Sequence, residues 1–170
     1  AINPCPSADD MAKIALMTAK TVRLFGIEPV IAMVSFSNFG SSQDPAAAKV
    51  RAAVEYLHRY YPDLIVDGEL QADFALNPEM LESKFPFSKL AGKKVNTLIF
   101  PNLEAANINY KMLKELYKVE SVGPITMGLR KPAHIFQLGA SVAEMVNMVA
   151  VAVVDAQEKE KLRKRWDSTS

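Results

Sequence analysis

The sequence has almost no cysteine and no long apolar run, and each shortage excludes a class of protein. Cys5 is the only cysteine among 170 residues, so the chain can form neither an internal disulfide nor a cysteine-based zinc site. The first twenty residues carry Asp9, Asp10 and Lys13, which argues against a signal peptide. The longest apolar run, 148–154, is far shorter than the about 20 residues of a membrane-spanning helix. We therefore expect a cytoplasmic protein without a membrane segment.

Glycine-rich nucleotide loops are also missing. Neither a Gly-x-Gly-x-x-Gly sequence nor a Walker loop occurs, so the usual devices for NAD(P) and ATP are excluded. The net charge of +1 gives no reason to expect a nucleic acid or an anionic membrane as partner. His58 and His134 lack a neighbouring Cys or second His, which argues against a metal site on them.

The composition that remains is that of an ordinary globular protein. Apolar residues make up 49 % and charged residues 23 % of the chain, a balance that argues against disorder. Helical patterns alternate with short apolar runs typical of buried strands. Helices are expected after Ser7, Asp44, Asn77 and Ser141 and over 104–117, and strands over 30–36, 64–67, 95–100, 122–127 and 133–136. This alternation predicts an α/β fold, a three-layer sandwich around a mostly parallel sheet.

Two of the expected helices carry apolar faces that should be buried. In 104–117 these residues are Ile108, Met112, Leu113 and Leu116. The last helix is apolar nearly all round from Met145 to Val154, so several of its sides should be covered.

Four polar clusters follow strand ends, where open α/β sheets place their ligands. They are 35–42, 67–73, 101–110 and 123–144. Small residues in the first would let backbone amides approach an anion, and a plain connecting loop is the alternative. Three carboxylates in the second could hold a metal, although Asp67-Gly68 is also typical of a turn. The helix start in the third could hold a phosphate or could be capped by a side chain.

In this order, the clusters resemble the phosphate acetyl/butyryl transferase family. The matching blocks are Ser35-Phe36-Ser37, Asp67-Gly68-Glu69-Leu70-Gln71-x-Asp73, Pro101-Asn102-Leu103-x-Ala105-x-Asn107-Ile108 and Gly123-Pro124-Ile125-x-x-Gly128-x-x-Lys131-Pro132. The resemblance implies a phosphotransacetylase-like fold, related to isocitrate/isopropylmalate dehydrogenases, with two subdomains and a coenzyme A cleft. It implies that this chain, 1–170, is part of such a domain. Residues 1–120 would be about the second subdomain, and 121–170 would return into the first.

The chain departs from the family where catalysis is expected. Gln137 and Leu138 stand where the resemblance places a catalytic Ser and the Arg after it. Glu144 stands at a catalytic Asp and is also explained by a capping box with Ser141. Phe39 stands where the resemblance implies a lysine in the first loop. Phosphotransacetylation needs a cation to hold acetyl phosphate and a base to produce the coenzyme A thiolate. Leu138 supplies neither, so no catalytic residue is expected.

Retained blocks with lost catalytic residues are similar to the C-terminal domain of large bacterial NADP-dependent malic enzymes. The similarity is greatest in 67–73, 101–108 and 146–157. It implies a silent domain that binds acetyl-CoA for feedback and supports a homo-oligomer. Malate oxidation, NADP and a divalent metal would belong to other domains of the parent chain, so no cofactor or metal is expected here. The alternatives are an active phosphate acetyl/butyryltransferase and a purely structural oligomerisation module.

The expected acetyl-CoA contacts lie at strand ends and helix starts. They are Ser37, Asn38, Gly40, Ser41, Asn107 and Lys131. Free amides would meet phosphates or pantetheine there, and Lys131 would add one positive charge. Asp67 and Gln71 are expected to shape the cleft, because a carboxylate repels phosphate.

Overall fold

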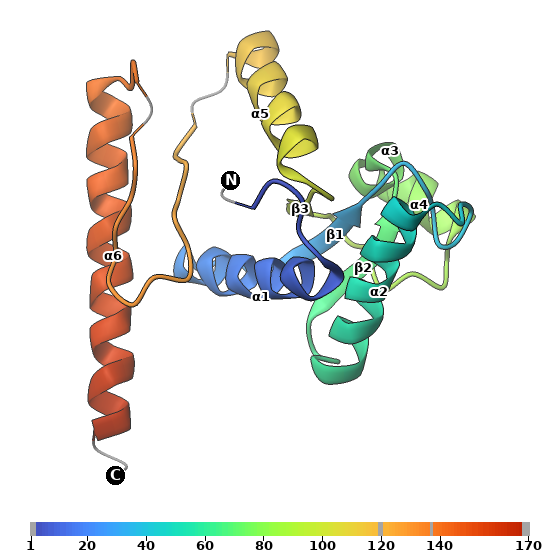
Figure 1. Cartoon of the computed structure of the whole chain (residues 1–170), viewed down its shortest axis with the longest axis horizontal. Helices are drawn as coiled ribbons and strands as arrows, with labels where there is room; N and C mark the ends of the chain where they lie inside the picture. The colour runs from blue at the N-terminus through green and yellow to red at the C-terminus, as the bar shows by residue number, and fades with distance from the viewer. Residues whose placement is uncertain (1–2, 119–120, 137, 168–170) are drawn as a thin grey trace. The chain divides into compact units, whose positions relative to one another are not determined.

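The computed structural model describes residues 3–118, 121–136 and 138–167 and divides into two compact units, residues 1–110 and 111–170 (Figure 1). The first unit holds a sheet of three parallel strands in the order β2-β1-β3. The strands are β1 (Val30–Val34), β2 (Ile65–Leu70) and β3 (Thr97–Ile99). The parallel sheet expected from the apolar runs is therefore confirmed.

Helices cover both faces of this sheet. Alternate residues of β1 enter two different apolar clusters because successive side chains of a strand point to opposite faces. Ile31 and Met33 pack with α1 (Ala8–Leu24) and α2 (Pro45–Tyr60). Ala32 and Val34 pack in the cluster that includes residues of α3 (Ala72–Leu76) and α4 (Pro78–Lys84). The first unit thus has the predicted three layers.

The predicted helix starts at Ser7, Asp44 and Asn77 are confirmed. Each side chain accepts a hydrogen bond from a backbone amide of its helix's first turn. Proline occupies the first position of both α2 and α4, where a missing amide proton costs no hydrogen bond. Local sequence is sufficient to begin these helices.

β2 is longer than the predicted strand over 64–67. It runs to Leu70, so Asp67, Gly68 and Glu69 lie inside the strand and not in a turn after it. Gly68 pairs with Met33 of β1, and the register shifts before Val34. A Cβ atom on Gly68 would lie 2.4 Å from the Met33 carbonyl oxygen. The glycine therefore permits an approach that any side chain would prevent.

The apolar faces predicted to be buried are largely exposed, so these predictions were wrong. In α5 (Leu103–Tyr117), Ile108, Met112, Leu113 and Leu116 are 51–69 % exposed. In α6 (Val142–Asp167), Met148 is buried, but Val146, Val149 and Val153 are 49–61 % exposed. Helical periodicity predicts a face that packs, but it does not specify the element that covers it.

The second unit contains the capped start of α6 and lacks the predicted strands. Neither 122–127 nor 133–136 is a strand among described residues 121–136. A hydrogen bond from the Thr126 amide to His134 Nδ1 (3.2 Å) joins the two segments, but a strand also requires a backbone ladder with a neighbour. Among the helices of the described residues, none combines the length and the apolar composition of a membrane-spanning segment.

Candidate functional site

The 35–44 loop after β1 is attached to the end of β2 by backbone hydrogen bonds. The Ser35 amide donates to the Leu70 carbonyl (2.9 Å), and the Phe39 amide donates to the Glu69 carbonyl (2.8 Å). The parallel arrangement places the carboxyl ends of both strands at one edge of the sheet, where α/β proteins form sites. The loop predicted to bind a ligand is therefore built on two strands.

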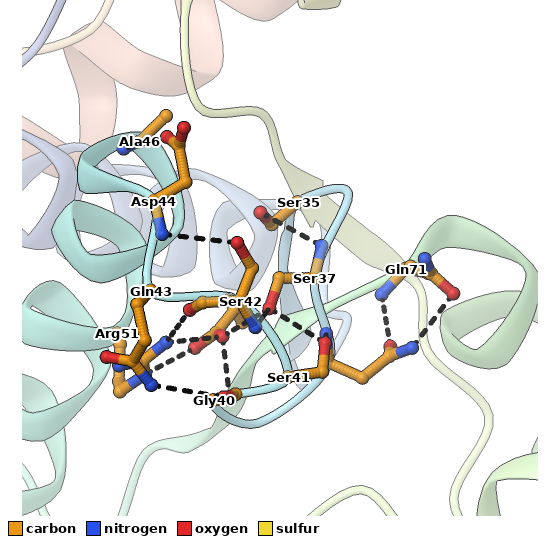
Figure 2. Close-up of polar contacts among 12 residues, drawn as sticks. Ser35, Ser37, Gly40, Ser41, Ser42, Gln43, Asp44, Ala46, Arg51 and Gln71 are labelled. Atoms are coloured by element: carbon orange, nitrogen blue, oxygen red, sulfur yellow. Dashed lines mark hydrogen bonds and ion pairs between the residues drawn. The ribbon is translucent and has the colours of Figure 1, made fainter.

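A buried carboxylate lies beneath this loop. Glu69 is 0 % exposed, and its Oε1 accepts hydrogen bonds from Ser37 Oγ and the Gly40 amide, both at 2.8 Å. Arg51 of α2 donates from Nη2 to Oε1 (2.9 Å) and from Nε to Oε2 (3.0 Å). Ser37, Gly40 and Arg51, labelled in Figure 2, all donate to this carboxylate. Two side chains and one backbone amide thus satisfy a charge that would otherwise be costly to bury.

The ionised form of Glu69 is the favoured one. Burial alone would raise its pKa, but the hydrogen bonds from Arg51, Gly40 and Ser37 outweigh burial and hold the pKa below its ordinary value. Arg51 also donates from Nη2 to the Ser42 carbonyl (2.9 Å). One guanidinium therefore connects α2, β2 and the far side of the loop.

Two amide side chains hold the other side of the loop. Asn38 Nδ2 donates to Gln71 Oε1 (2.8 Å), and the backbone amide of Gln71 donates back to Asn38 Oδ1 (2.7 Å). Gln71 Nε2 also donates to the Phe36 carbonyl (2.6 Å). Gln71, predicted to shape a cleft, contacts the loop directly.

The backbone amides of the loop donate to acceptors within the protein. Ser41 Oγ accepts from the Asn38 amide, and Ser37 Oγ accepts from the Ser42 amide, both at 3.0 Å. Hydrogen bonds within the protein engage the backbone amides of Ser35, Ser37, Asn38, Phe39, Gly40, Ser41, Ser42 and Asp44. The structure brings Ser37, Asn38, Gly40 and Ser41 together. Their contacts build the loop, and their contact with a ligand stays a prediction.

Asp67 also has a structural environment. It is 6 % exposed, and its Oδ2 accepts hydrogen bonds from Ser88 Oγ and the Lys89 amide, both at 2.8 Å. His58 Nε2 lies 3.7 Å from Oδ1 and 2.8 Å from the Val66 carbonyl oxygen. Among described residues, no group of three His, Cys, Asp or Glu could hold a metal ion. The protein itself thus supplies the partners of Asp67 and Glu69.

The start of α5 is capped by the side chain of Asn102 and by the backbone carbonyl of Pro4. Asn102 Oδ1 accepts from the Ala105 amide (2.8 Å), and the Pro4 carbonyl accepts from the Leu103 amide (3.1 Å). Asn107 lies one turn further along the helix and is exposed. The arrangement matches the capping alternative for this cluster.

The segment before α6 belongs to the second unit. Lys131 is exposed, and Leu138 is fully exposed. Gln137 lies outside the described residues. Glu144 forms the predicted capping box. Its carboxylate accepts from the Ser141 amide (2.8 Å), and the Glu144 amide donates to Ser141 Oγ (3.2 Å). Lys114 of α5 also donates to Glu144 Oε1 (2.8 Å).

These contacts make Glu144 an unusually strong acid. The Lys114 ammonium first, and then the Ser141 amide and hydroxyl, lower the pKa of Glu144 from 4.5 to about 2. A carboxyl group whose pKa is lower in the folded than in the unfolded protein stabilises the fold at pH values above the unfolded pKa. This stabilisation is lost as the pH falls through the folded pKa. We expect the start of α6 to loosen between about pH 4.5 and pH 2. An NMR titration of the Glu144 carboxyl carbon would measure this.

The same titration in variants separates the causes. Lys114→Met should raise the midpoint most, and Ser141→Ala should raise it less. A wild-type midpoint close to 4.5 would contradict the expected effect.

The sequence did not identify Arg51 as part of this site. It lies in the middle of α2, outside all four polar clusters. An indirect signal would have followed from extending the predicted strand past residue 67, because an acidic residue such as Glu69 in a strand buried on both faces needs a cation from a neighbouring element.

Comparison with known proteins identifies the family. Residues 1–153 match the family described as phosphate acetyl/butaryl transferase, and the chain belongs to this family. It is 46 % identical over 157 residues to the NADP-dependent malic enzyme of Escherichia coli strain K12, covering 92 % of this chain and 21 % of that protein. It is 44 % identical over 158 residues to the phosphate acetyltransferase of Clostridium acetobutylicum, covering 92 % of this chain and 47 % of that protein.

A solved structure shows the same fold. The crystal structure of a phosphotransacetylase from Streptococcus pyogenes superposes with a TM-score of 0.87 at 41 % identity, covering 93 % of this chain and 48 % of that chain. The chain thus spans less than half of each of these three proteins.

Proposed function

We propose that this chain is a catalytically silent phosphotransacetylase-like domain of an NADP-dependent malic enzyme. In this proposal it binds acetyl-CoA as a feedback effector and supports a homo-oligomer. NADP, a divalent metal and malate oxidation belong to the other domains of the cytoplasmic parent protein. The similarity to a malic enzyme at 46 % identity supports this assignment.

The observation that carries the proposal is the chemistry of Leu138, just before α6, and of Glu144, in the first turn of α6. Leu138 offers neither a positive charge for acetyl phosphate nor a base. The Glu144 carboxyl, with a pKa of about 2, is too weak a base to deprotonate a thiol at neutral pH, since an effective base has a pKa near the working pH. An acetyl transfer step therefore lacks its two main groups at these positions.

An active phosphate acetyltransferase is the second candidate. The 44 % identity to the Clostridium acetobutylicum enzyme is nearly the same as the 46 % to the malic enzyme, so overall similarity does not separate them. A purely structural module is the third candidate. The exposed valines of α6 favour it to the extent that apolar surface of this kind seeks a partner.

One experiment on the full-length protein that carries this chain distinguishes all three candidates. The protein is given acetyl-CoA and phosphate. Acetyl-CoA binding is measured by calorimetry, and acetyl phosphate formation is measured by assay. We expect binding without turnover, together with inhibition of malate-dependent NADPH formation. Turnover near the typical enzyme value of about 10 per second would establish the active transferase, and absence of both binding and turnover would leave the structural module.

The proposed contact residues add a second arm. The effector is proposed to meet the 35–44 loop, at Ser37, Asn38, Gly40 and Ser41, together with Asn107 and Lys131. Lys131→Ala should weaken acetyl-CoA binding by about 1.5–3 kcal/mol if its ammonium contacts a phosphate. The matched control is Lys161→Ala, which removes an exposed lysine paired with Glu158 on α6. Equal affinities in the two variants would place the effector elsewhere.

A further inference from the structure

We propose that Arg51 and Glu69 are a positioning pair, which fixes the 35–44 loop in its ligand-binding shape before an effector arrives. The inference rests on the proposed function, since it takes acetyl-CoA as the ligand of that loop. Neither residue was among the expected contacts. Glu69 is 0 % exposed and therefore acts on a ligand only through the loop.

The geometry ties the loop to the sheet and to a helix at once. Glu69 extends from β2 and accepts from Ser37 Oγ and the Gly40 amide near the middle of the loop. Arg51 extends from α2 and donates to the Ser42 carbonyl beyond them. The two Arg51–Glu69 hydrogen bonds, of 2.9 and 3.0 Å, join both anchors. Removing Glu69 would free Ser37 and Gly40, and removing Arg51 would free Ser42. Because each residue holds the other in place, we expect either loss to loosen both the middle and the far part of the loop.

This attachment has a consequence for ligand affinity. A loop that spends only a fraction of its time in the binding shape has its affinity reduced by that fraction. A binding shape that already exists also avoids the entropy cost of ordering the loop during binding. If a variant is ordered about a tenth of the time, acetyl-CoA should bind about tenfold more weakly.

Two variants test the pair with little change in side-chain size. Glu69→Gln keeps an oxygen acceptor but removes the charge. Arg51→Lys keeps the charge but loses the planar fork that contacts Glu69 and Ser42 together. The matched control is Arg23→Gln, because Arg23 forms a two-bond ion pair with Glu28 in the same unit, exposed and at the end of α1.

Two measurements are made on the full-length protein that carries this chain. Hydrogen exchange of the peptide containing Gly40 reports the order of the loop, and calorimetry reports acetyl-CoA affinity. In both pair variants we expect exchange at Gly40 to accelerate about tenfold and affinity to fall about tenfold. Exchange of peptides from α1 and β1 should not change, because a general loss of stability would accelerate them as well. Saturating acetyl-CoA should restore protection at Gly40, and Arg23→Gln should behave as wild type.

The outcomes separate this inference from the proposed function. Unchanged exchange at Gly40 in Arg51→Lys would show that the loop is held by other contacts and would overturn the inference. Faster exchange with unchanged affinity would also overturn it, while leaving acetyl-CoA binding in place. A wild-type protein that does not bind acetyl-CoA would refute the proposed function and the ligand-positioning role together. If Glu69→Gln does not fold, Arg51→Lys decides alone.

Discussion

Replacing Gly68 by alanine should destabilise the first unit by about 3 kcal/mol, from overpacking and backbone strain together. The added Cβ atom would lie 2.4 Å from the backbone oxygen of Met33, which cannot move away as a flexible side chain could. Gly68 also has a φ of 143°, a region that residues with a side chain rarely adopt. Against a typical stability of about 5–15 kcal/mol, this is a large loss. Urea unfolding followed by circular dichroism would measure it.

Gly92 provides the matched control. Its φ of 68° is also positive, but the nearest atoms to an added Cβ are the Glu82 carboxylate oxygens at 3.8 and 3.9 Å. Gly92→Ala should therefore lose only the backbone cost of about 1–2 kcal/mol. Equal losses in the two variants would show that the close approach of β1 and β2 does not limit position 68.

Replacing Asp67 by alanine should destabilise the first unit by a similar amount, about 3 kcal/mol. The carboxylate accepts hydrogen bonds from Ser88 Oγ and the Lys89 amide, which attach β2 to the segment after α4. A hydrogen bond to a charged group contributes about 1.5–3 kcal/mol, and the buried Ser88 hydroxyl would lose its acceptor. The midpoint of urea unfolding again reports the effect.

Asp73 tests whether the carboxylates of 67–73 act as one group. It is exposed in the first turn of α3, so Asp73→Ala should cost less than about 1 kcal/mol, the usual value of a charge at a helix start. Similar stability in both alanine variants, with loss of a ligand or metal from each, would support the functional interpretation of this acidic cluster instead.

Contacts that are local in sequence could be predicted, and contacts between distant segments could not. Asp44-Pro45 and Asn77-Pro78 begin helices because the caps act within the first turn. The apolar runs indicated a parallel sheet because both of its faces are covered. The polar residues of β2 concealed its full length, because the partners of Asp67 and Glu69 come from other elements.

The position of the polar loop after β1 was predicted, but the contacts that build this loop were not, and its binding of a ligand stays a prediction. Small residues after β1 indicated a loop with available amides, and the structure engages those amides within the protein. The main acceptor, Glu69, comes from another strand, and the sequence alone does not show that Glu69 lies next to the 35–44 loop. The exposed faces of α5 and α6 were missed for the same reason. The apolar face of a helix can be predicted from local sequence, but the element that packs against it cannot.

The aromatic contacts of Phe39 limit which residues fit at its position. It stands where the family resemblance implies a lysine, and its ring lies 5.0 Å from the rings of Phe85 and Phe87. Each such ring pair contributes about 0.5–1.5 kcal/mol, so lysine at position 39 would lose both contacts at once and leave an apolar neighbourhood around an ammonium. A lysine that fits here would therefore also require changes at Phe85 and Phe87.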